Sequence, residues 1–278
     1  LYMNKIVSKE LFSENVVKFE IEAPRIAKAR RAGHFVIVRV DENGERIPLT
    51  IAGSNLEKGT ITLVVQRIGV STHKLFNLNV GDCVADVVGP LGKATKIEKQ
   101  ANTVLCCGGG VGVAPLLPII IAHKNAGNKV VAVLAARTKE LIILEDEVRK
   151  YADDVIIMTD DGSYGEKGVV TVGMEKVINR EKVSEAVIIG PAIMMKFGAL
   201  TTKKYEIPTV VSLNTIMVDG TGMCGACRVM VGGKTKFVCV DGPEFDAHEV
   251  DFDGMLKRMG AFRDEEQAAL AAYKEANK

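Results

Sequence analysis

The sequence predicts an antiparallel β-barrel, followed by an α/β domain with a parallel sheet and by a small C-terminal module that contains cysteines. Short strand-like runs separated by turn signals fill the chain up to about Gly92. Strand-length and helix-length apolar runs then alternate to about Ser212, and a Gly-rich segment with cysteines follows. A chain of 278 residues is long enough for two domains and a small third module.

The first domain is expected to span residues 1–98. Apolar and polar residues alternate with period two in the strands of this region, which indicates strands with one buried face. The expected strands are residues 16–22, 35–40, 61–66 and 83–88, with turn signals at residues 41–44, 58–59, 81–82 and 89–90. Regular short strands with such turns favour a small antiparallel barrel.

The second domain is expected to span residues 99–212. Its expected strands are residues 103–107, 129–134, 155–158, 186–189 and 209–212, and its expected helices are residues 113–125, 141–151, 173–178 and 192–204. This alternation predicts βαβ units and a parallel sheet.

The third module is expected to span residues 213–278. Residues 228–231 and 236–240 read as two strands joined at Gly232-Gly233, a pair typical of a type I′ turn. Residues 264–278 are rich in Ala, Glu and Lys and predict a surface helix.

Composition excludes several classes of protein. The net charge is +1 without a long basic run, so nucleic acid is not an expected partner. The longest apolar stretch, near residues 113–122, is too short to cross a bilayer, and no secretory signal precedes it. The cysteine pattern favours a reducing cytoplasm, and Cys83, Cys106 and Cys107 are expected to be small buried hydrophobic residues.

Four residues of the third module have the spacing of a [2Fe–2S] site. Asp219, Cys224, Cys227 and Cys239 follow the plant-type ferredoxin pattern, with Asp at the first position. A carboxylate is a hard anionic ligand that suits ferric iron. Two other interpretations of Cys224 and Cys227 remain, which are half of a zinc site and a dithiol redox pair.

Glycines surround these ligand positions. Gly220, Gly222 and Gly225 allow the backbone to wrap closely and to direct N–H groups inward. Asp219 also has a simpler interpretation, because Asp in a Gly-rich loop often bonds its own backbone as a turn residue.

Turns at strand ends predict a nucleotide site in the second domain. The run Gly108, Gly109, Gly110, Val111 and Gly112 follows the first strand and precedes a helix, so backbone N–H groups can face a pyrophosphate. This run lacks the third glycine of the dinucleotide fingerprint. The alternative interpretation is therefore a tight turn that binds nothing. The later turns at Arg137 and at Gly190-Pro191 follow other strands of the same sheet and are expected to converge on it.

One barrel segment is a candidate flavin site. Pro48 removes a ladder donor, so the strand around residues 46–50 is expected to be locally open or at an edge. Arg46 can balance a pyrophosphate, and the Thr50 hydroxyl can reach a ring nitrogen. The alternative is an ordinary edge strand with a surface arginine.

The order of these parts resembles the ferredoxin-NADP reductase superfamily over nearly the whole chain. More narrowly, it is similar to the electron-transfer subunits of type B dihydroorotate dehydrogenase. The flavin strand R-P-[LI]-[ST] of that family is matched at residues 48–50, although Arg46 lies one place early. An Arg followed by G-x-G-T appears at residues 67–72, with Ser71 for the second Gly, and the GPLG turn lies at residues 89–92. Asp219 makes the small subunits of NADH-dependent ferredoxin:NADP oxidoreductases the most similar group.

That resemblance implies FAD, a [2Fe–2S] cluster with one Asp ligand, and hydride exchange with NAD(H). It also implies a larger partner subunit that holds a second flavin, [4Fe–4S] clusters and the NADP(H) site, and through which ferredoxin is reached. The implied FAD contacts are Arg46, Pro48, Leu49, Thr50, Val65, Gln66, Arg67, Gly69, Ser71 and Thr72.

The preference for NAD or NADP follows only in part from the residues. Arg137 and Lys139 can hold a 2′-phosphate, whereas Asp160 and Asp161 repel one, and the resemblance favours NAD. A flavin that accepts one or two electrons is needed between a hydride donor and a one-electron cluster. Three classes stay open: a bifurcating redox subunit, a dihydroorotate dehydrogenase subunit, and a zinc- or nucleotide-binding regulator.

Overall fold

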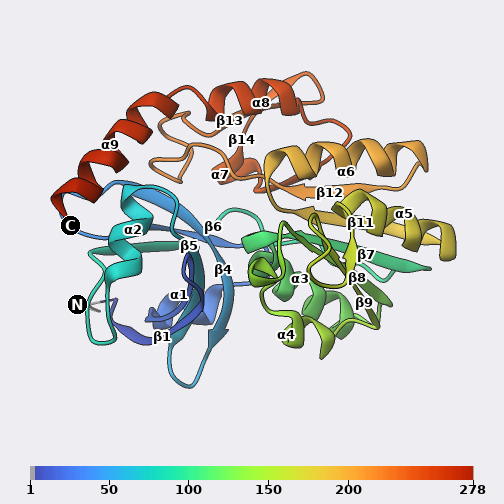
Figure 1. Cartoon of the computed structure of the whole chain (residues 1–278), viewed down its shortest axis with the longest axis horizontal. Helices are drawn as coiled ribbons and strands as arrows, with labels where there is room; N and C mark the ends of the chain where they lie inside the picture. The colour runs from blue at the N-terminus through green and yellow to red at the C-terminus, as the bar shows by residue number, and fades with distance from the viewer. Residues whose placement is uncertain (1–3, 278) are drawn as a thin grey trace.

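The structure, a computed structural model, describes residues 4–277, which form three parts that pack against one another (Figure 1). The first part is a six-stranded antiparallel sheet in the order β1-β2-β5-β4-β3-β6, as predicted. An isolated bridge between Lys5 and Cys83 links its two edges, so that the sheet curls into a barrel. The elements are β1 (Ile6–Ser13), β2 (Val16–Glu22), α1 (Pro24–Ala29), β3 (Phe35–Arg39), β4 (Arg46–Asn55), β5 (Thr60–Gln66), α2 (Val70–Asn77) and β6 (Asp86–Leu91).

Strand β4 has two halves with different neighbours. Its first half, from Arg46 to Thr50, pairs only with β3, and its second half, from Ile51 onward, pairs with β5. Pro48 lies in the half that has one neighbour, opposite Ile37. The missing N–H of Pro48 therefore faces no ladder partner, which confirms the locally open strand expected from the sequence.

The second part is a sheet with the strand order β10-β9-β8-β7-β11-β12-β15, covered by helices on both faces. Leu105 and Cys107 of β7 pack in a core with α5 and α6, and Val104 and Cys106 pack on the other face in a core with α3. Burial on both faces explains the nearly continuous apolar strands. The elements are β7 (Thr103–Gly109), α3 (Val113–Asn125), β8 (Val130–Ala136), α4 (Glu145–Arg149), β9 (Asp154–Thr159), β10 (Glu166–Lys167), α5 (Val170–Arg180), β11 (Val183–Ile189), α6 (Ala192–Lys204) and β12 (Thr209–Ser212).

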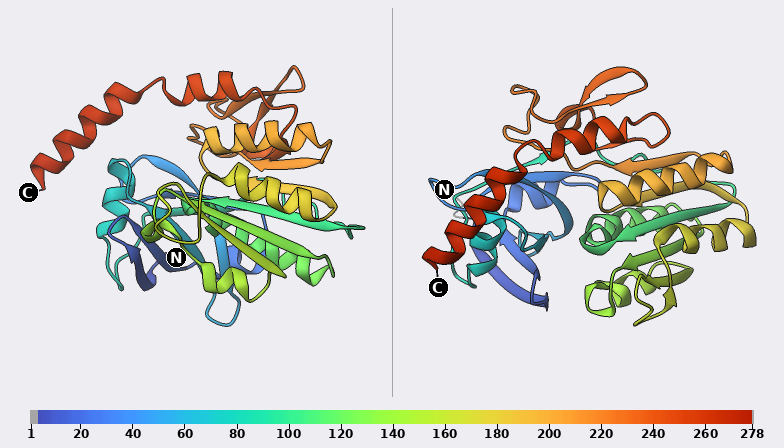
Figure 2. Two further views of the ribbon diagram at one scale, coloured as in Figure 1. Left: turned by 45° about the vertical axis from the view of Figure 1, so that its right-hand side comes forward. Right: turned by 45° about the horizontal axis from the view of Figure 1, so that its top comes forward.

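The C-terminal part lies across the other two. It contains β13 (Arg228–Val231), β14 (Lys234–Phe237), α7 (Val238–Asp241), β15 (Glu244–Asp246), α8 (Phe252–Met259) and α9 (Arg263–Ala276). Strand β15 joins the nucleotide sheet antiparallel to β12. Figure 2 shows α9 extending from α8 along the outside of the molecule toward the barrel, where Tyr273 contacts His73 and Asn77 of α2.

Several local predictions need correction. The second hairpin strand ends at Phe237, because its partner β13 begins at Arg228, opposite it. Cys239 therefore lies on the short helix α7 and not on a strand. Cys83 is exposed at the barrel seam, whereas Cys106 and Cys107 are buried as expected. The helix expected at residues 141–151 is limited to α4, and β1 and α8 were not predicted.

Other local expectations agree with the structure. Helices α3 and α6 have the predicted bounds, and Gly232 and Gly233 both have positive φ in the hairpin turn. Helix α9 has no buried residue, as expected of a surface helix, although its predicted end at Lys278 lies outside the described residues. Among residues 4–277, no helix has the length and apolar composition that a membrane span requires.

Candidate functional site: a nucleotide cleft beside a cysteine loop

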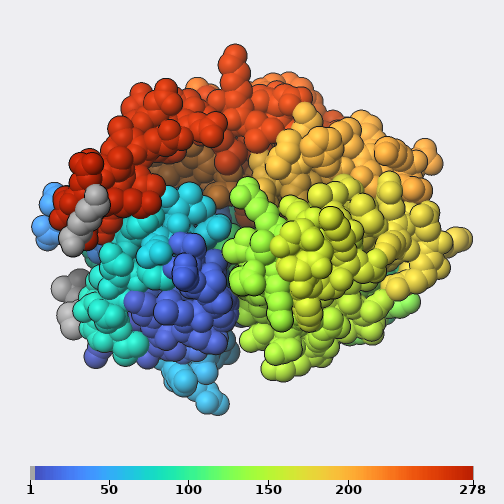
Figure 3. Space-filling view, in the orientation of Figure 1, coloured from blue at the N-terminus to red at the C-terminus, as the bar shows by residue number. Residues whose placement is uncertain are grey.

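A cleft of about 1620 Å³ opens where the barrel, the nucleotide sheet and the C-terminal part meet (Figure 3). Single small-molecule sites typically occupy about 300–1,000 Å³, so this cleft has room for two nucleotides. Residues from both predicted sites line it together. The predicted residues on its wall are Pro48, Leu49, Thr50, Gln66, Gly109, Gly110, Val111, Gly112, Arg137, Gly190 and Pro191.

The glycines of the loop after β7 have different roles. A Cβ on Gly112 would lie 2.4 Å from the carbonyl oxygen of Ile189, and one on Gly109 would lie 2.3 Å from the sulfur of Met194. The backbone of the β11 turn thus requires a glycine at position 112, whereas the space beside Gly109 is filled by the side chain of Met194 from α6. Gly110 has φ +53° and an open space where a Cβ would be, so it leaves the cleft side of the loop free. Gly108 is buried under Val113 and does not line the cleft.

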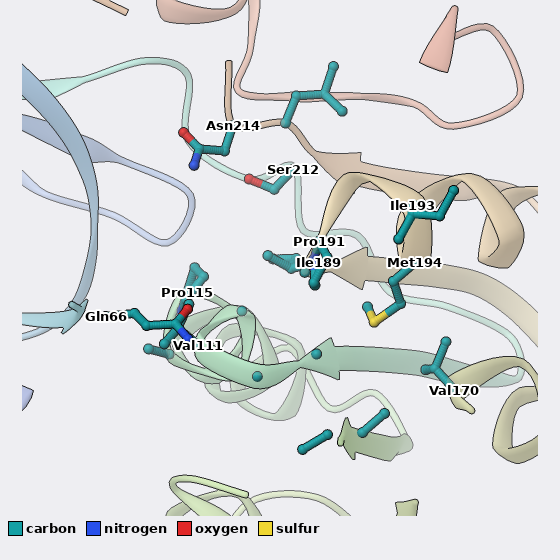
Figure 4. Close-up of a pocket in the computed structure, with 18 of the residues that line it drawn as sticks. Gln66, Val111, Pro115, Val170, Ile189, Pro191, Ile193, Met194, Ser212 and Asn214 are labelled. Atoms are coloured by element: carbon teal, nitrogen blue, oxygen red, sulfur yellow. The ribbon is translucent and has the colours of Figure 1, made fainter. Parts of the chain in front are cut away.

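The N-terminus of α3 supplies the polar part of this wall. No side chain caps the helix, and its first turn contains no acidic residue. The turn from Gly110 to Gly112 leads directly into the helix, where the Val113 N–H donates to the carbonyls of Gly110 and Val111 and Pro115 has no N–H. The donors at this partially positive end therefore come mainly from the glycine turn. A pyrophosphate fits this end of the cleft, and Figure 4 shows Val111 and Pro115 at that position.

The barrel side of the cleft follows the alternation of its strands. Gln66 and Val64 line the cleft, whereas the intervening Val65 has an exposed fraction of 0% and packs in the barrel core. Adjacent residues of a strand point to opposite faces, so the side chains of Val65 and Gln66 cannot both reach the ligand. Thr50 lines the cleft, and within residues 4–277 its hydroxyl makes no hydrogen bond to another side chain.

In the segment from Arg67 to Thr72, the predicted flavin contacts Arg67, Gly69, Ser71 and Thr72 lie beside the cleft and do not line it. Arg67 stacks 4.7 Å from the ring centroid of Phe76. The Ser71 hydroxyl donates to the Glu45 carboxylate at 3.2 Å, and Thr72 Oγ1 accepts from the N–H of Gly69 at 2.9 Å. These side chains hold the start of α2, and in this segment Ile68 is the residue that reaches the cleft wall.

Arg46 has a different partner from the one expected. Its guanidinium donates to the carbonyl oxygens of Val218 at 2.8 Å and Asp219 at 3.3 Å. It is absent from the wall of the cleft and instead joins strand β4 to the cysteine loop.

Of the two predicted acidic residues Asp160 and Asp161, only Asp160 lines the cleft, which Glu175 of α5 also lines. Asp161 is exposed, and its carboxylate accepts from the backbone N–H and the hydroxyl of Ser163 at 2.9 and 2.7 Å. The Ser163 hydroxyl is the main reason that the pKa of Asp161 lies below its usual value. Asp160 and Arg137 both line the cleft and follow the ends of β9 and β8, respectively.

Sequence reasoning missed a third wall of the cleft. Ser212 reaches the cleft from the end of β12, Asn214 from the segment after it, and Pro243 from the position just before β15. Figure 4 shows Ser212 and Asn214 on the side opposite Val111 and Pro115. The signal was present, because Ser212 ends a parallel strand and ligands bind at such ends.

The cysteine loop (residues 218–227) and helix α7 bring two of the four predicted ligands together. The sulfur atoms of Cys227 and Cys239 are 3.3 Å apart, and both residues are buried. Two thiolates bound to one tetrahedral ion at about 2.3 Å lie about 3.8 Å apart, so this pair fits a shared metal atom. Burial is the main cause that raises the pKa of the Cys239 thiol, to about 12, and the neighbouring Cys227 adds to it.

The other two predicted ligands lie on the exposed side of the same loop. Cys224 is exposed. The Asp219 carboxylate accepts hydrogen bonds from the Thr221 hydroxyl and from the N–H groups of Met223 at 2.9 Å and Cys224 at 3.3 Å. The Thr221 bond is the main reason that the pKa of Asp219 falls to about 2, so this carboxylate is ionised. Gly220, Gly222 and Gly225 all have positive φ, which lets the loop curl around this side.

The comparisons with known proteins agree with these two sites. Residues 3–95 match the oxidoreductase FAD-binding domain, and residues 214–251 match the iron–sulfur cluster binding domain of dihydroorotate dehydrogenase B. A Thermotoga maritima homologue of the electron-transfer subunit of dihydroorotate dehydrogenase B is 50% identical over 98% of this chain and 95% of its own. This chain belongs to the electron-transfer subunit family of dihydroorotate dehydrogenase B and its homologues.

Other members of this family extend the comparison. A Desulforamulus reducens dihydroorotate dehydrogenase B electron-transfer subunit is 31% identical over 88% of this chain and 96% of its own. A solved structure of NADH-dependent reduced ferredoxin-NADP oxidoreductase contains a chain that is 47% identical, with a TM-score of 0.93 and coverage of 100% and 99%. The chain is thus an oxidoreductase subunit of this family with an FAD-binding domain and an iron–sulfur module.

Proposed function

We propose that this chain is the NAD(H)-dependent flavin and iron–sulfur subunit of an electron-bifurcating, NADH-dependent reduced ferredoxin:NADP oxidoreductase. The observation that supports it most is the adjacency of the two sites, because strand β4 carries both Thr50 on the cleft and Arg46 on the cysteine loop. The likeness over the whole chain to the ferredoxin-NADP oxidoreductase structure supports the choice of enzyme.

The cleft residues have separate roles in this proposal. The loop from Gly109 to Gly112 and the N-terminus of α3 bind pyrophosphate through backbone N–H groups. Thr50 orients the flavin ring beside Pro48 and Leu49, and Gly190 with Pro191 forms the adjoining wall for the nicotinamide nucleotide. FAD, when bound, accepts a hydride from NADH and releases single electrons.

Selectivity for NAD over NADP is assigned to Asp160. Its negative charge on the cleft wall repels a 2′-phosphate, and a ribose hydroxyl can donate to it. Arg137 also lines the cleft, and its positive charge attracts a 2′-phosphate, so it reduces the preference for NAD over NADP.

The ligand set proposed for the [2Fe–2S] cluster is Asp219, Cys224, Cys227 and Cys239. Cys227 and Cys239, whose sulfur atoms nearly touch, share one iron, and Asp219 and Cys224 hold the other. The cluster, when bound, carries one electron at a time. The chain's own contribution is a loop of glycines and N–H groups around the exposed edge.

A larger subunit with a second flavin, [4Fe–4S] clusters and the NADP(H) site is the proposed partner. Val218 and Met223 of the cysteine loop and Val240 of α7 have exposed fractions of 49%, 87% and 40%, and Cys224 of the same loop is exposed. An apolar surface of this kind beside a redox centre fits a protein interface. Ferredoxin and NADP(H) are reached through that partner.

Anaerobic co-purification from the native source tests this function. We expect one FAD, about two irons and two sulfides per chain, reduction by NADH in preference to NADPH, and a larger flavin and iron–sulfur partner. Zinc without iron would refute the cluster. A dihydroorotate-oxidising flavoprotein as the partner would instead establish the second candidate, the electron-transfer subunit of an NAD-dependent dihydroorotate dehydrogenase, which the match of residues 214–251 favours.

A further inference from the structure

Arg46 makes a contact between two parts of the chain that are far apart in sequence. It is the first residue of β4, and its guanidinium donates from Nε to the carbonyl of Val218 and from Nη2 to the carbonyl of Asp219. These acceptors lie 172 and 173 residues away along the chain. A planar guanidinium with fixed donors defines the position of a backbone segment more strictly than a flexible ammonium does.

A second attachment holds the same loop from the apolar side. Gly220 has φ +81°, and a Cβ there would lie 2.7 Å from Cγ1 of Ile37 and 3.0 Å from Cδ1 of Leu91. Met217, with an exposed fraction of 6%, shares a core with Phe35 and Ile37 of β3. The loop is thus in close contact with the barrel on one side of Asp219 and is bonded to Arg46 on the other.

Strand β4 connects this attachment to the flavin side of the cleft. Thr50 follows Arg46 by four residues, which corresponds to about 13 Å along an extended strand. The intervening segment pairs with β3, so it is a rigid element between the two sites. The loop and the cleft are therefore fixed to one strand at a set separation.

The positive charge of Arg46 has different surroundings from that of Arg39, its neighbour in the ladder. Arg39 lies opposite Arg46 in the ladder and forms an ion pair with Asp86 at 2.5 Å. Within residues 4–277, no carboxylate forms a salt bridge with Arg46. Its positive charge consequently acts on the backbone of the Asp219 loop. Positive charge and hydrogen bonds near a cluster stabilise its reduced, more negative form.

We propose that Arg46 is a positioning residue that fixes the cluster loop to the flavin strand and raises the reduction potential of the cluster. The inference rests on the proposed function, since it assumes a cluster at Asp219, Cys224, Cys227 and Cys239. It differs from the flavin pyrophosphate role expected from sequence, in which Arg46 would hold FAD.

The test compares Arg46→Met, Arg46→Lys and the control Arg39→Met in the full chain with FAD and cluster. An electron paramagnetic resonance titration gives the cluster potential, and stopped-flow absorbance follows flavin and cluster separately. We expect Arg46→Met to lower the potential, to keep one FAD per chain, and to slow electron transfer from flavin to cluster several-fold. Arg46→Lys should have a cluster potential between those of Arg46→Met and the parent, and Arg39→Met should have the potential of the parent.

A second variant tests the positioning without changing charge. Gly220→Ala pushes the loop away from Ile37 and Leu91, so it should slow flavin-to-cluster transfer while leaving flavin reduction by NADH unchanged. Loss of FAD in Arg46→Met would overturn the inference in favour of a flavin contact. Equal potentials in Arg46→Met and Arg39→Met would also overturn it. Absence of iron from the parent protein would instead refute the proposed function.

Discussion

The nucleotide cleft and the cysteine loop lie on the same barrel strands, but they are built in different ways. The cleft is wide and is formed by strand ends, glycine turns and a helix N-terminus, so its binding groups are mostly backbone. The loop is small, and its chemistry depends on a few side chains held by glycines with positive φ. We therefore expect all-or-none effects from substitutions in the loop and graded effects from substitutions in the cleft.

Cys227→Ala is expected to have the largest effect. The thiol is buried, and its sulfur lies 3.3 Å from that of Cys239. The variant should lose its iron and sulfide but keep one FAD, because FAD binds in the cleft. Metal and flavin analysis of anaerobically purified protein checks this, with Cys83→Ala, at an exposed cysteine, as the control. Joint loss of FAD and iron would mean that the two sites are not separable.

Variants of Asp219 test whether the cluster requires this carboxylate as a ligand or requires only the loop conformation that the carboxylate stabilises. If the carboxylate binds iron, Asp219→Cys should keep the cluster with a changed midpoint potential, because a thiolate binds iron more covalently. Asp219→Ala should give a labile cluster. If Asp219 only accepts the N–H groups of Met223 and Cys224, the potentials of both variants should equal that of the parent. Redox titration with electron paramagnetic resonance separates these outcomes.

Glu244 lies where the C-terminal part contacts the segment that joins the barrel to the nucleotide sheet. It is half-buried at the start of β15, where its carboxylate accepts from Thr95 Oγ1 at 2.5 Å. Burial raises the pKa of Glu244 from 4.5 to about 7. Because the folded state then binds the proton more tightly than the unfolded state, the resulting stabilisation is complete below pH 4.5. It is lost as the pH rises through about 7.

Glu244→Gln should remove this pH dependence. At pH 8 it should be more stable than the parent by up to about 3 kcal/mol, since each pKa unit corresponds to 1.36 kcal/mol. At pH 4 the two proteins should differ little. Thermal melting at both pH values measures this. A variant that is less stable than the parent at pH 8 would show that the ionised carboxylate has a stabilising partner.

Thr50→Val is expected to have the smallest effect and is the clearest test of a graded cleft. It removes one hydrogen bond to the flavin, worth about 0.5–1.5 kcal/mol, so flavin reduction by NADH should slow by about 2- to 12-fold. FAD should remain bound. Thr62→Val on β5, which does not line the cleft, is the matched control in stopped-flow measurements. An unchanged rate in Thr50→Val would remove Thr50 from the proposed site.

The sequence by itself determined the architecture and the turns at the strand ends that border the cleft. Period-two strands, the strand–helix alternation and Pro48 are local signals, and each acts through the backbone within a few residues. The loop after β7 and the turn at Gly190 were found for the same reason, because strand C-terminal ends meet at one edge of a parallel sheet. The spacing of Cys224, Cys227 and Cys239 is also local, and it indicated an iron–sulfur module, which the match of residues 214–251 supports.

The tertiary structure alone decided which side chains face which site. Arg46 looked like a flavin contact, but a loop 172 residues away supplies its acceptors. Strand register placed Gln66 in the cleft and Val65 in the core, and a local turn with Ser163 left Asp160 on the cleft wall instead of Asp161. Asn214 and Pro243 entered the site because the chain after β12 folds back over the cleft. Such partnerships depend on contacts between distant segments, and no pattern of neighbouring residues encodes them.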